Sequence, residues 1–160
     1  MTFRVGQGLD VHAFDQARPL VLAGLRIGDS GGLAGHSDGD AVLHAVTDAL
    51  LGAVGAGDIG EYFPSNDPRW DGASSEVFVN EALSVIDARY GDILNVDVTI
   101  IASRPRLSPH RQAMIESLAA LLRIPVAQVS VKATTTDHLG FVGREEGLCA
   151  MAVVLLEMRG

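Results

Sequence analysis

The stretch GHSDGDAVLHAVTDALLGAVGAGDIG, residues 35–60, carries the clearest helical pattern in the chain. Ser37 or Asp38 can cap a helix that runs to about Val54, because a short polar side chain there accepts hydrogen bonds from the free N–H groups of the first turn. Alanine stands at every fourth position from 41 to 49. Since residues four apart share one face of a helix, this face is smooth and allows close packing against a neighbouring element.

Strand and helix patterns alternate on both sides of this helix. Alternating or β-branched apolar residues predict strands over residues 3–14, 19–24, 96–101, 129–135 and 147–158. Apolar residues at helical spacing predict two further helices, one from Ser74 or Ser75 to Tyr90 or Gly91 and one from Pro109 to Ile124. Residues 147–158 fit a helix or a strand by period alone, and their valines favour a strand.

The resulting fold class is α/β (α+β): a single compact domain over residues 1–160, with a mixed β-sheet that helices cover on one face. A length of 160 residues is typical of one domain. The mean hydropathy is +0.25, and several strands are apolar throughout. One layer of helices leaves part of this apolar surface uncovered, so we expect the chain to associate with copies of itself.

The composition argues against several classes of protein. The formal net charge is −8 and the 12 basic residues are scattered, which disfavours binding to nucleic acid or to an acidic membrane surface. The apolar run Leu148–Leu156 is too short to cross a membrane. The first residues lack the pattern of a secretory signal, which favours a cytoplasmic location. A chain this acidic needs cations to handle phosphate.

Three side chains of metal-binding type stand out. Asp10 and His12 are two apart in a predicted strand and share a face, so they can bind one ion, although a loop aspartate and a surface histidine would give the same pattern. His44 lies among apolar residues of the predicted helix, where a core histidine bonded to a carboxylate is the alternative. Together these three supply nitrogen and oxygen ligands with a fourth position open, as in catalytic zinc sites. Asp48 would then orient the His44 ring, or is a solvated helix carboxylate.

Two further segments can bind an anion or a polar ligand. His36 and Ser37 precede the helix, where free N–H groups and the helix dipole favour phosphate, unless Ser37 serves only as a cap. Asp58 lies at a tight turn and can bond its own backbone or a ligand hydroxyl.

A threonine-rich segment follows the strand predicted over 129–135. Thr134, Thr135, Asp137 and Arg144 offer hydroxyl, carboxylate and guanidinium groups, which suit phosphate and a second metal ion. Threonines at the end of a strand are also typical of an ordinary edge strand.

Four motifs occur in the order and spacing of a known family: GLDVHAF (8–14), GHSDGDAVLHAVTDALLGAVGAGDIGEYFP (35–64), VDVTIIA (96–102) and VKATTTDHLGFVGREEG (131–147). The chain resembles the 2-C-methyl-D-erythritol 2,4-cyclodiphosphate synthases of the non-mevalonate isoprenoid pathway, from about Arg4 to Leu156. The resemblance implies a phosphorus–oxygen lyase. In this reaction the 2-phosphate of 4-diphosphocytidyl-2-C-methyl-D-erythritol 2-phosphate attacks the β-phosphorus, expels CMP and closes a cyclic diphosphate.

The resemblance also implies a role for particular positions of this chain. The implied metal ligands are Asp10, His12 and His44 for Zn²⁺ and Asp137 for Mg²⁺ or Mn²⁺, and the implied catalytic pair is His36 and Thr135. The methylerythritol is expected against Asp58, Ile59, Gly60, Phe63, Pro64, Ser65, Asn66 and Asp67. The cytidine is expected against Ala102, Ser103, Arg104, Pro105, Arg106, Leu107, Ser108, Ala133, Thr134 and Thr135, and further substrate contacts are expected from Ser37, Phe141 and Arg144.

The chain departs from the family's usual residues at four positions: Asp137 in place of Glu, Ser65 in place of Asp, Arg106 in place of Lys and Glu145 in place of Gly. The shorter side chain of Asp137 puts its direct contact with the second metal in doubt. None of the four removes an implied zinc ligand.

The family forms homotrimers whose sheets face an inner channel and whose sites lie between neighbours. Arg144 and Glu146 match channel residues proposed to bind isoprenoid diphosphates, and a structural salt bridge is the alternative. Two rival functions remain open: a zinc phosphohydrolase that uses water as the nucleophile, and a trimer that binds a cytidine nucleotide or isoprenoid diphosphate without turnover.

Overall fold

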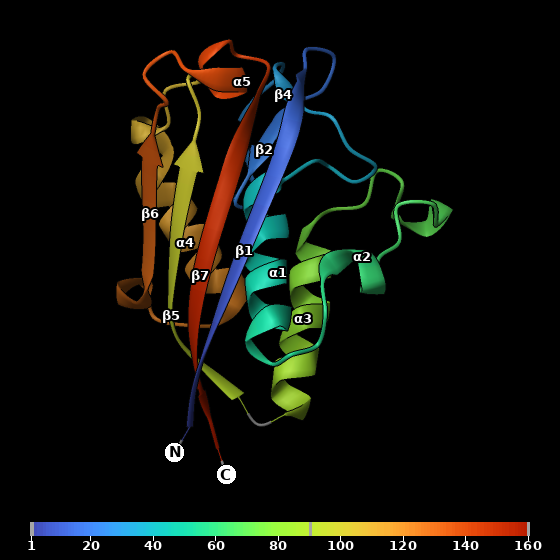
Figure 1. Ribbon diagram of the computed structural model, residues 1–160, viewed down its shortest axis with the longest axis vertical. Helices are drawn as coiled ribbons and strands as arrows, with labels where there is room; N and C mark the ends of the chain where they lie inside the picture. The colour runs from blue at the N-terminus through green and yellow to red at the C-terminus, as the bar shows by residue number, and fades with distance from the viewer. Residues whose placement is uncertain (1, 90, 160) are drawn as a thin grey trace.

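The structure is a computed structural model that describes residues 2–89 and 91–159. Its main sheet has five strands in the order β4-β1-β7-β5-β6 (Figure 1). These are β1 (Thr2–Asp15), β4 (Gly32–Leu33), β5 (Gly91–Ile101), β6 (Val129–Thr134) and β7 (Gly147–Met158), and a separate hairpin pairs β2 (Leu20–Leu22) with β3 (Leu25–Gly28). β5 and β6 are parallel and the other neighbours antiparallel, which confirms the predicted mixed sheet and the strand at 147–158.

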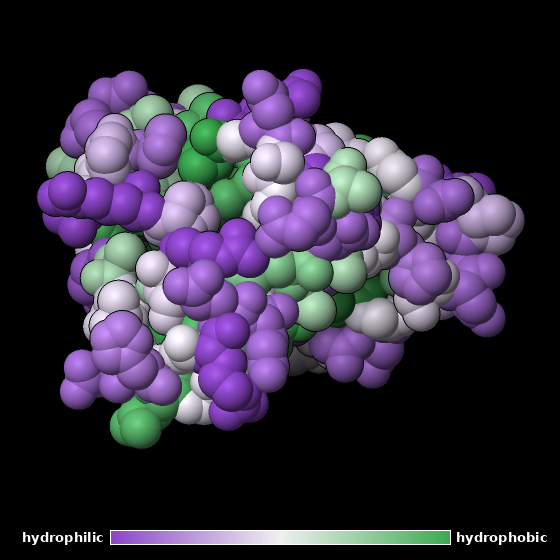
Figure 2. Space-filling view, turned by 90° about the horizontal axis from the view of Figure 1, so that it is seen from above, coloured by the Kyte–Doolittle hydropathy of each residue, from purple (hydrophilic) through white to green (hydrophobic). Residues whose placement is uncertain are grey.

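Three longer helices cover one face of the sheet, as predicted: α1 (Ala41–Ala53), α3 (Glu76–Ala88) and α4 (Arg111–Leu122) (Figure 1). Of the predicted ends of α3, Tyr90 lies outside the described residues. Short helical turns that the sequence patterns missed are α2 (Ile59–Tyr62), α5 (Gly140–Gly143), η1 (Pro68–Trp70), η2 (Ser108–His110) and η3 (Val126–Gln128). The segment with α2 and η1 projects from the side of the molecule, and from above this projection is largely hydrophilic (Figures 1 and 2).

α1 lies unusually close to β1. A Cβ atom added to Gly6 would stand 1.8 Å from the carbonyl oxygen of Ala49, and one added to Gly8 would stand 2.0 Å from that of Ala45. The strand therefore offers bare backbone to the alanine face of the helix, which confirms the close packing predicted from the alanine spacing. This contact brings the middle of α1 next to the part of β1 that carries Asp10.

The predicted cap of α1 was wrong by two to three residues. Asp40, not Ser37 or Asp38, is the N-cap, and its side chain accepts a hydrogen bond from the Leu43 N–H. Asp40 also accepts from the Gly24 N–H at 2.7 Å, so it ties the turn of the β2–β3 hairpin to the helix. Burial raises the pKa of Asp40 to about 6, against the opposite effect of these N–H groups. The sequence pattern missed Asp40 as the cap because contact with the β2–β3 hairpin, distant in sequence, holds its carboxylate in place.

The second face of the sheet carries apolar side chains in contact with solvent. Val5 is 66% exposed, Leu9 51%, Val11 48% and Val153 40%. Large apolar side chains gathered on one surface are typical of a face that binds another chain. Among the helices of the described residues, none is long and apolar enough to cross a membrane.

Candidate functional site

Asp10, His12 and His44 meet at the contact between β1 and α1. Asp10 Oδ2 lies 2.7 Å from His12 Nε2 and 3.1 Å from His44 Nδ1, and the two ring nitrogens are 3.2 Å apart. The three side chains are 25%, 14% and 12% exposed. Their ligand atoms all lie within 4.8 Å of one another, so the three residues could hold one metal ion.

The donor set of this triad fits zinc. His12 Nδ1 bonds the carbonyl oxygen of Ala34, which only accepts, so His12 donates through Nδ1 and keeps the lone pair of Nε2 for the triad. On the other ring, Nε2 of His44 bonds Ser75 Oγ at 2.9 Å and Ser37 Oγ at 3.1 Å, which leaves Nδ1 toward Asp10. Two imidazoles and a carboxylate with an open fourth position are typical of catalytic zinc sites.

The triad perturbs its own acid–base behaviour. Burial alone would raise the pKa of Asp10, but hydrogen bonds from His12 and His44 hold it well below its usual range. Burial would lower the pKa of His12, and the hydrogen bond and charge of Asp10 outweigh this and raise it. Without a metal, the pair therefore favours an aspartate with a protonated His12.

A cleft of about 620 Å³ opens beside the triad. It is lined by His12, Gly35, His36, Ser37, His44, Ile59, Gly60, Phe63, Pro64, Ser65, Asn66, Trp70 and Phe78. Most of the residues predicted to contact the methylerythritol thus lie around the imidazoles. Phe78 and Trp70 were missed: the ring of Phe78 lies 4.5 Å from that of Phe63, and its place in an apolar helical stripe gave no sign of a cleft wall.

The loop with His36 is held by Arg18, which lies in the turn between β1 and β2. Arg18 donates to the carbonyl oxygens of Gly35 and Ser37, the residues on either side of His36. This contact fixes the backbone that presents His36 to the cleft. The sequence predicted that His36 and Ser37 stand at the start of the helix. α1 begins only at Ala41, so the two residues lie in the loop before it and Arg18 holds that loop.

Three of the predicted carboxylates bond backbone rather than facing the cleft. Asp48 accepts from the Ile59 N–H at 2.8 Å, and in the described part of the chain it makes no hydrogen bond to His44. The predicted hydrogen bond from His44 to Asp48 is therefore wrong: the ring nitrogen that faces away from the triad bonds Ser75 and Ser37 instead. Asp58 caps α2 by accepting from the Glu61 N–H, and Asp67 caps η1 and pairs with Arg69 at 2.5 Å.

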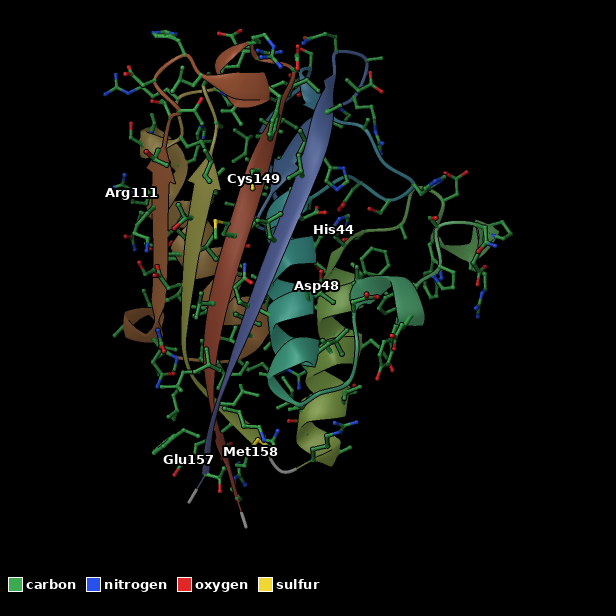
Figure 3. All side chains as sticks on the ribbon, in the orientation of Figure 1. His44, Asp48, Arg111, Cys149, Glu157 and Met158 are labelled. Carbon is green, nitrogen blue, oxygen red and sulfur yellow. The ribbon has the colours of Figure 1, made fainter. Side chains whose placement is uncertain are left out.

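A second, smaller cleft of about 260 Å³ contains the residues predicted to contact cytidine. It is lined by Ala102, Ser103, Pro105, Arg106, Leu107, Ser108, Arg111, Ala133, Thr134 and Thr135. Arg111 was not predicted, because a single basic residue at the start of a helix has no distinctive pattern. The two clefts share no lining residue, and Figure 3 shows Arg111 at the left edge of the molecule and His44 near its middle, with strands of the sheet between them, so the two clefts are separate within one chain.

The remaining predicted residues lie outside the described lining of both clefts. Arg104 pairs with Glu145 at 3.1 Å and lies over the Phe14 ring at 4.1 Å. Arg144 pairs with Glu146 at 2.9 Å, the salt bridge left open as an alternative. Asp137 and Phe141 lie in the exposed segment that follows β6, beyond Thr135. Their roles remain predictions.

Comparisons with known proteins identify the family. The model of the YgbB family matches residues 3–157. The 2-C-methyl-D-erythritol 2,4-cyclodiphosphate synthase of Bordetella avium is 52% identical over 154 residues, covering 96% of this chain and 95% of the relative. The bifunctional enzyme IspD/IspF of Caulobacter vibrioides is 54% identical over 96% of this chain, but the chain spans only 40% of that relative's length.

A solved structure agrees with these relatives in fold. The IspF of Plasmodium falciparum, in a CDP complex, has a TM-score of 0.86 and 35% identity, covering 99% of this chain and 97% of its own. The resemblance seen in the sequence motifs is thereby confirmed. The chain belongs to the YgbB family, together with the 2-C-methyl-D-erythritol 2,4-cyclodiphosphate synthases.

Proposed function

We propose that the chain is a phosphorus–oxygen lyase that forms 2-C-methyl-D-erythritol 2,4-cyclodiphosphate and CMP from 4-diphosphocytidyl-2-C-methyl-D-erythritol 2-phosphate. The observation that carries this proposal is the convergence of Asp10, His12 and His44 at the wall of a cleft with His36 and Ser37. Its similarity to the 2-C-methyl-D-erythritol 2,4-cyclodiphosphate synthase of Bordetella avium supports it. The step would belong to the non-mevalonate isoprenoid pathway.

The reaction joins two parts of one substrate. An oxygen of the 2-phosphate forms a bond to the β-phosphorus, and the bond from that phosphorus to the oxygen shared with the α-phosphate breaks. CMP leaves with this oxygen and its electron pair. Because the attacking phosphate oxygen already carries negative charge, no strong base is required, and catalysis depends on alignment and on neutralising charge.

The side chains of the first cleft are suited to this alignment. Asp10, His12 and His44 would hold Zn²⁺, which polarises the β-phosphate when bound. His36, on the loop that Arg18 braces, would position the diphosphate. The apolar walls at Ile59 and Phe63 would hold the methylerythritol and exclude water, which would otherwise compete as the nucleophile.

The second cleft would take the cytidine, and a CDP complex of a similar structure supports a nucleotide ligand. Because the two clefts of one chain are separate and strands of the sheet lie between them, we propose that the first cleft of one copy meets the second cleft of another. The exposed apolar sheet face, with Val5 and Leu9, supports association into a homotrimer. Thr135 would then contribute to catalysis from the neighbouring copy, and Asp137 would hold Mg²⁺ or Mn²⁺.

Two finer predictions go with this assembly. A trimer with the sheets inside would enclose a channel, and an isoprenoid diphosphate in that channel would bind the Arg144 side chain. In the single chain this side chain forms an ion pair with Glu146. A cytoplasmic location remains the expectation for an enzyme of a small phosphorylated metabolite.

Phosphorus NMR of the reaction tests the proposed function. The protein, supplied with Zn²⁺ and Mg²⁺, is incubated with the substrate. The signals of a cyclic diphosphate and of CMP in equal amounts are expected. Products of simple hydrolysis would identify a phosphohydrolase instead, and unchanged substrate would favour a binding protein without turnover.

A further inference from the structure

The side of the His44 ring that faces away from the triad lies in a buried network of hydroxyl groups. Nε2 of His44 is 2.9 Å from Ser75 Oγ and 3.1 Å from Ser37 Oγ. Ser75 is fully buried and Ser37 is 4% exposed. Behind them, Asp38 bonds both the backbone and the side chain of Ser75.

The directions of these hydrogen bonds are set by Asp38. A carboxylate only accepts, and Asp38 accepts from the Ser75 Oγ–H, from the Ser75 N–H at 3.0 Å and from the Asp40 N–H at 3.1 Å. The one hydroxyl proton of Ser75 is thus committed to Asp38. Toward His44, Ser75 Oγ can only accept, so Nε2 must carry a proton. In the neutral ring that binds a metal, this leaves the lone pair on Nδ1, the atom that faces Asp10.

Ser37 cannot set this direction. Its Oγ accepts from the Gly39 N–H at 3.3 Å, and no carboxylate takes its own proton in the described residues. Ser37 can therefore either donate to Nε2 of His44 or accept from it. Both tautomers of the ring would satisfy Ser37, whereas only one satisfies Ser75.

We propose that Ser75, with Asp38 behind it, is a positioning residue that fixes the tautomer and orientation of His44 for metal binding. The proposal rests on the metal site of the proposed function. With the proton on Nδ1 instead, an N–H group would point into the triad and could not bind a cation. Partners that orient a ligating histidine in this way are typically worth about 10–100-fold in metal affinity.

The test measures the affinity of purified, metal-free protein for Zn²⁺ by competition with a chromophoric chelator. Ser75→Ala removes the acceptor. Asp38→Asn keeps the shape of the carboxylate but replaces one of its two accepting oxygens with an N–H donor, so it can no longer accept from the Ser75 hydroxyl and both backbone N–H groups together. Both are expected to weaken Zn²⁺ binding by about 10–100-fold. Ser84→Ala is the matched control, because Ser84 lies on the helix that Ser75 begins and, in the described residues, its hydroxyl donates to the Asn80 carbonyl oxygen, away from the triad.

A second readout separates positioning from general damage. Co²⁺ loaded in place of Zn²⁺ reports ligand geometry through its visible absorption, which should change in Ser75→Ala and stay unchanged in Ser84→Ala. Asp48→Asn also removes a negative charge near Asp10 and His44, but in the described residues Asp48 bonds Ile59 and makes no hydrogen bond to His44. It should therefore weaken affinity far less than Asp38→Asn and leave the spectrum unchanged.

The outcomes distinguish this proposal from the proposed function. Wild-type protein that binds no Zn²⁺ would overturn the metal site and this proposal with it. Wild-type affinity in Asp38→Asn, or in a folded Ser75→Ala, would overturn the role of Ser75 alone. If Ser75→Ala does not fold, Asp38→Asn decides. Loss of affinity in Asp48→Asn but not in Asp38→Asn would return the orienting role to Asp48.

Discussion

His44 Nδ1 lies 3.1 Å from Asp10 Oδ2, although 34 positions separate the two residues in the chain. The contact exists because α1 rests directly on the backbone of β1 at Gly6 and Gly8. A strand with ordinary side chains at these positions would keep the helix farther away. The two glycines therefore hold the helical histidine within reach of the strand carboxylate, and packing and metal binding depend on each other.

Gly8→Ala should destabilise the fold and weaken the metal site. The added Cβ would lie 2.0 Å from the Ala45 carbonyl oxygen, so α1 must shift, at a cost of roughly 1–3 kcal/mol or more. Gly52→Ala is the control: nothing lies within 4 Å of its Cβ, and alanine in a helix is favoured over glycine by about 1 kcal/mol. The urea concentration at the midpoint of unfolding should fall for Gly8→Ala and rise for Gly52→Ala. Equal stability of Gly8→Ala and wild type would contradict the close contact.

His12→Ala or His44→Ala should lower the zinc content of the purified protein far more than Asp48→Ala. Each histidine substitution removes one of the three ligands, whereas Asp48 lies outside the triad and accepts a hydrogen bond from the Ile59 N–H. Metal analysis by mass spectrometry gives the stoichiometry directly. One zinc ion per chain in the wild type is expected, and full occupancy in His44→Ala would remove that residue from the site.

Metal binding should release protons near pH 6.5. Burial lowers the pKa of His12, but contact with Asp10 outweighs this and raises the pKa above its usual value of 6.5. At pH 6.5, more than half of the metal-free molecules therefore carry a proton on both nitrogens of the His12 ring. A metal requires the unprotonated ring, so affinity should fall as the pH falls. Calorimetry in two buffers of different ionisation enthalpy counts the protons. Identical heats in both buffers would show that His12 is already neutral.

Asp137→Glu should retain or raise activity, because the longer side chain extends the carboxylate toward the proposed second metal ion. Asp137→Ala should raise the Mg²⁺ or Mn²⁺ concentration needed for half-maximal activity. The measurement is a metal titration of the rate at saturating Zn²⁺. An unchanged requirement in Asp137→Ala would show that this carboxylate is not a ligand.

The long elements and the triad could be predicted from local patterns. The valines of residues 147–158 favour a strand, and the structure has β7 there. The period of two in a strand put Asp10 and His12 on one face, and His44 was the polar exception on an apolar helix. The structure brings these three together as the sequence predicts.

The surroundings of the triad could not be predicted, because they depend on contacts between elements. Helical spacing alone paired His44 with Asp48, but the chain after α1 turns back and offers the Ile59 N–H to that carboxylate. Ser75 reaches His44 across 31 positions, from the start of a different helix. Only the packing of α3 against α1 reveals it, and in the sequence Ser75 is an ordinary helix cap.

In the proposed assembly, one active site combines the first cleft of one copy with the second cleft of another. Chains carrying His44→Ala and chains carrying Thr135→Ala are each expected to be inactive, since each lacks one half of every site. Dissociated, mixed in equal amounts and reassembled at random, they place an intact first cleft against an intact second cleft in about a quarter of the sites. We predict recovery of about a quarter of wild-type activity. Activity that stays at the background of the single variants, with subunit exchange shown by mass spectrometry, would contradict the shared site.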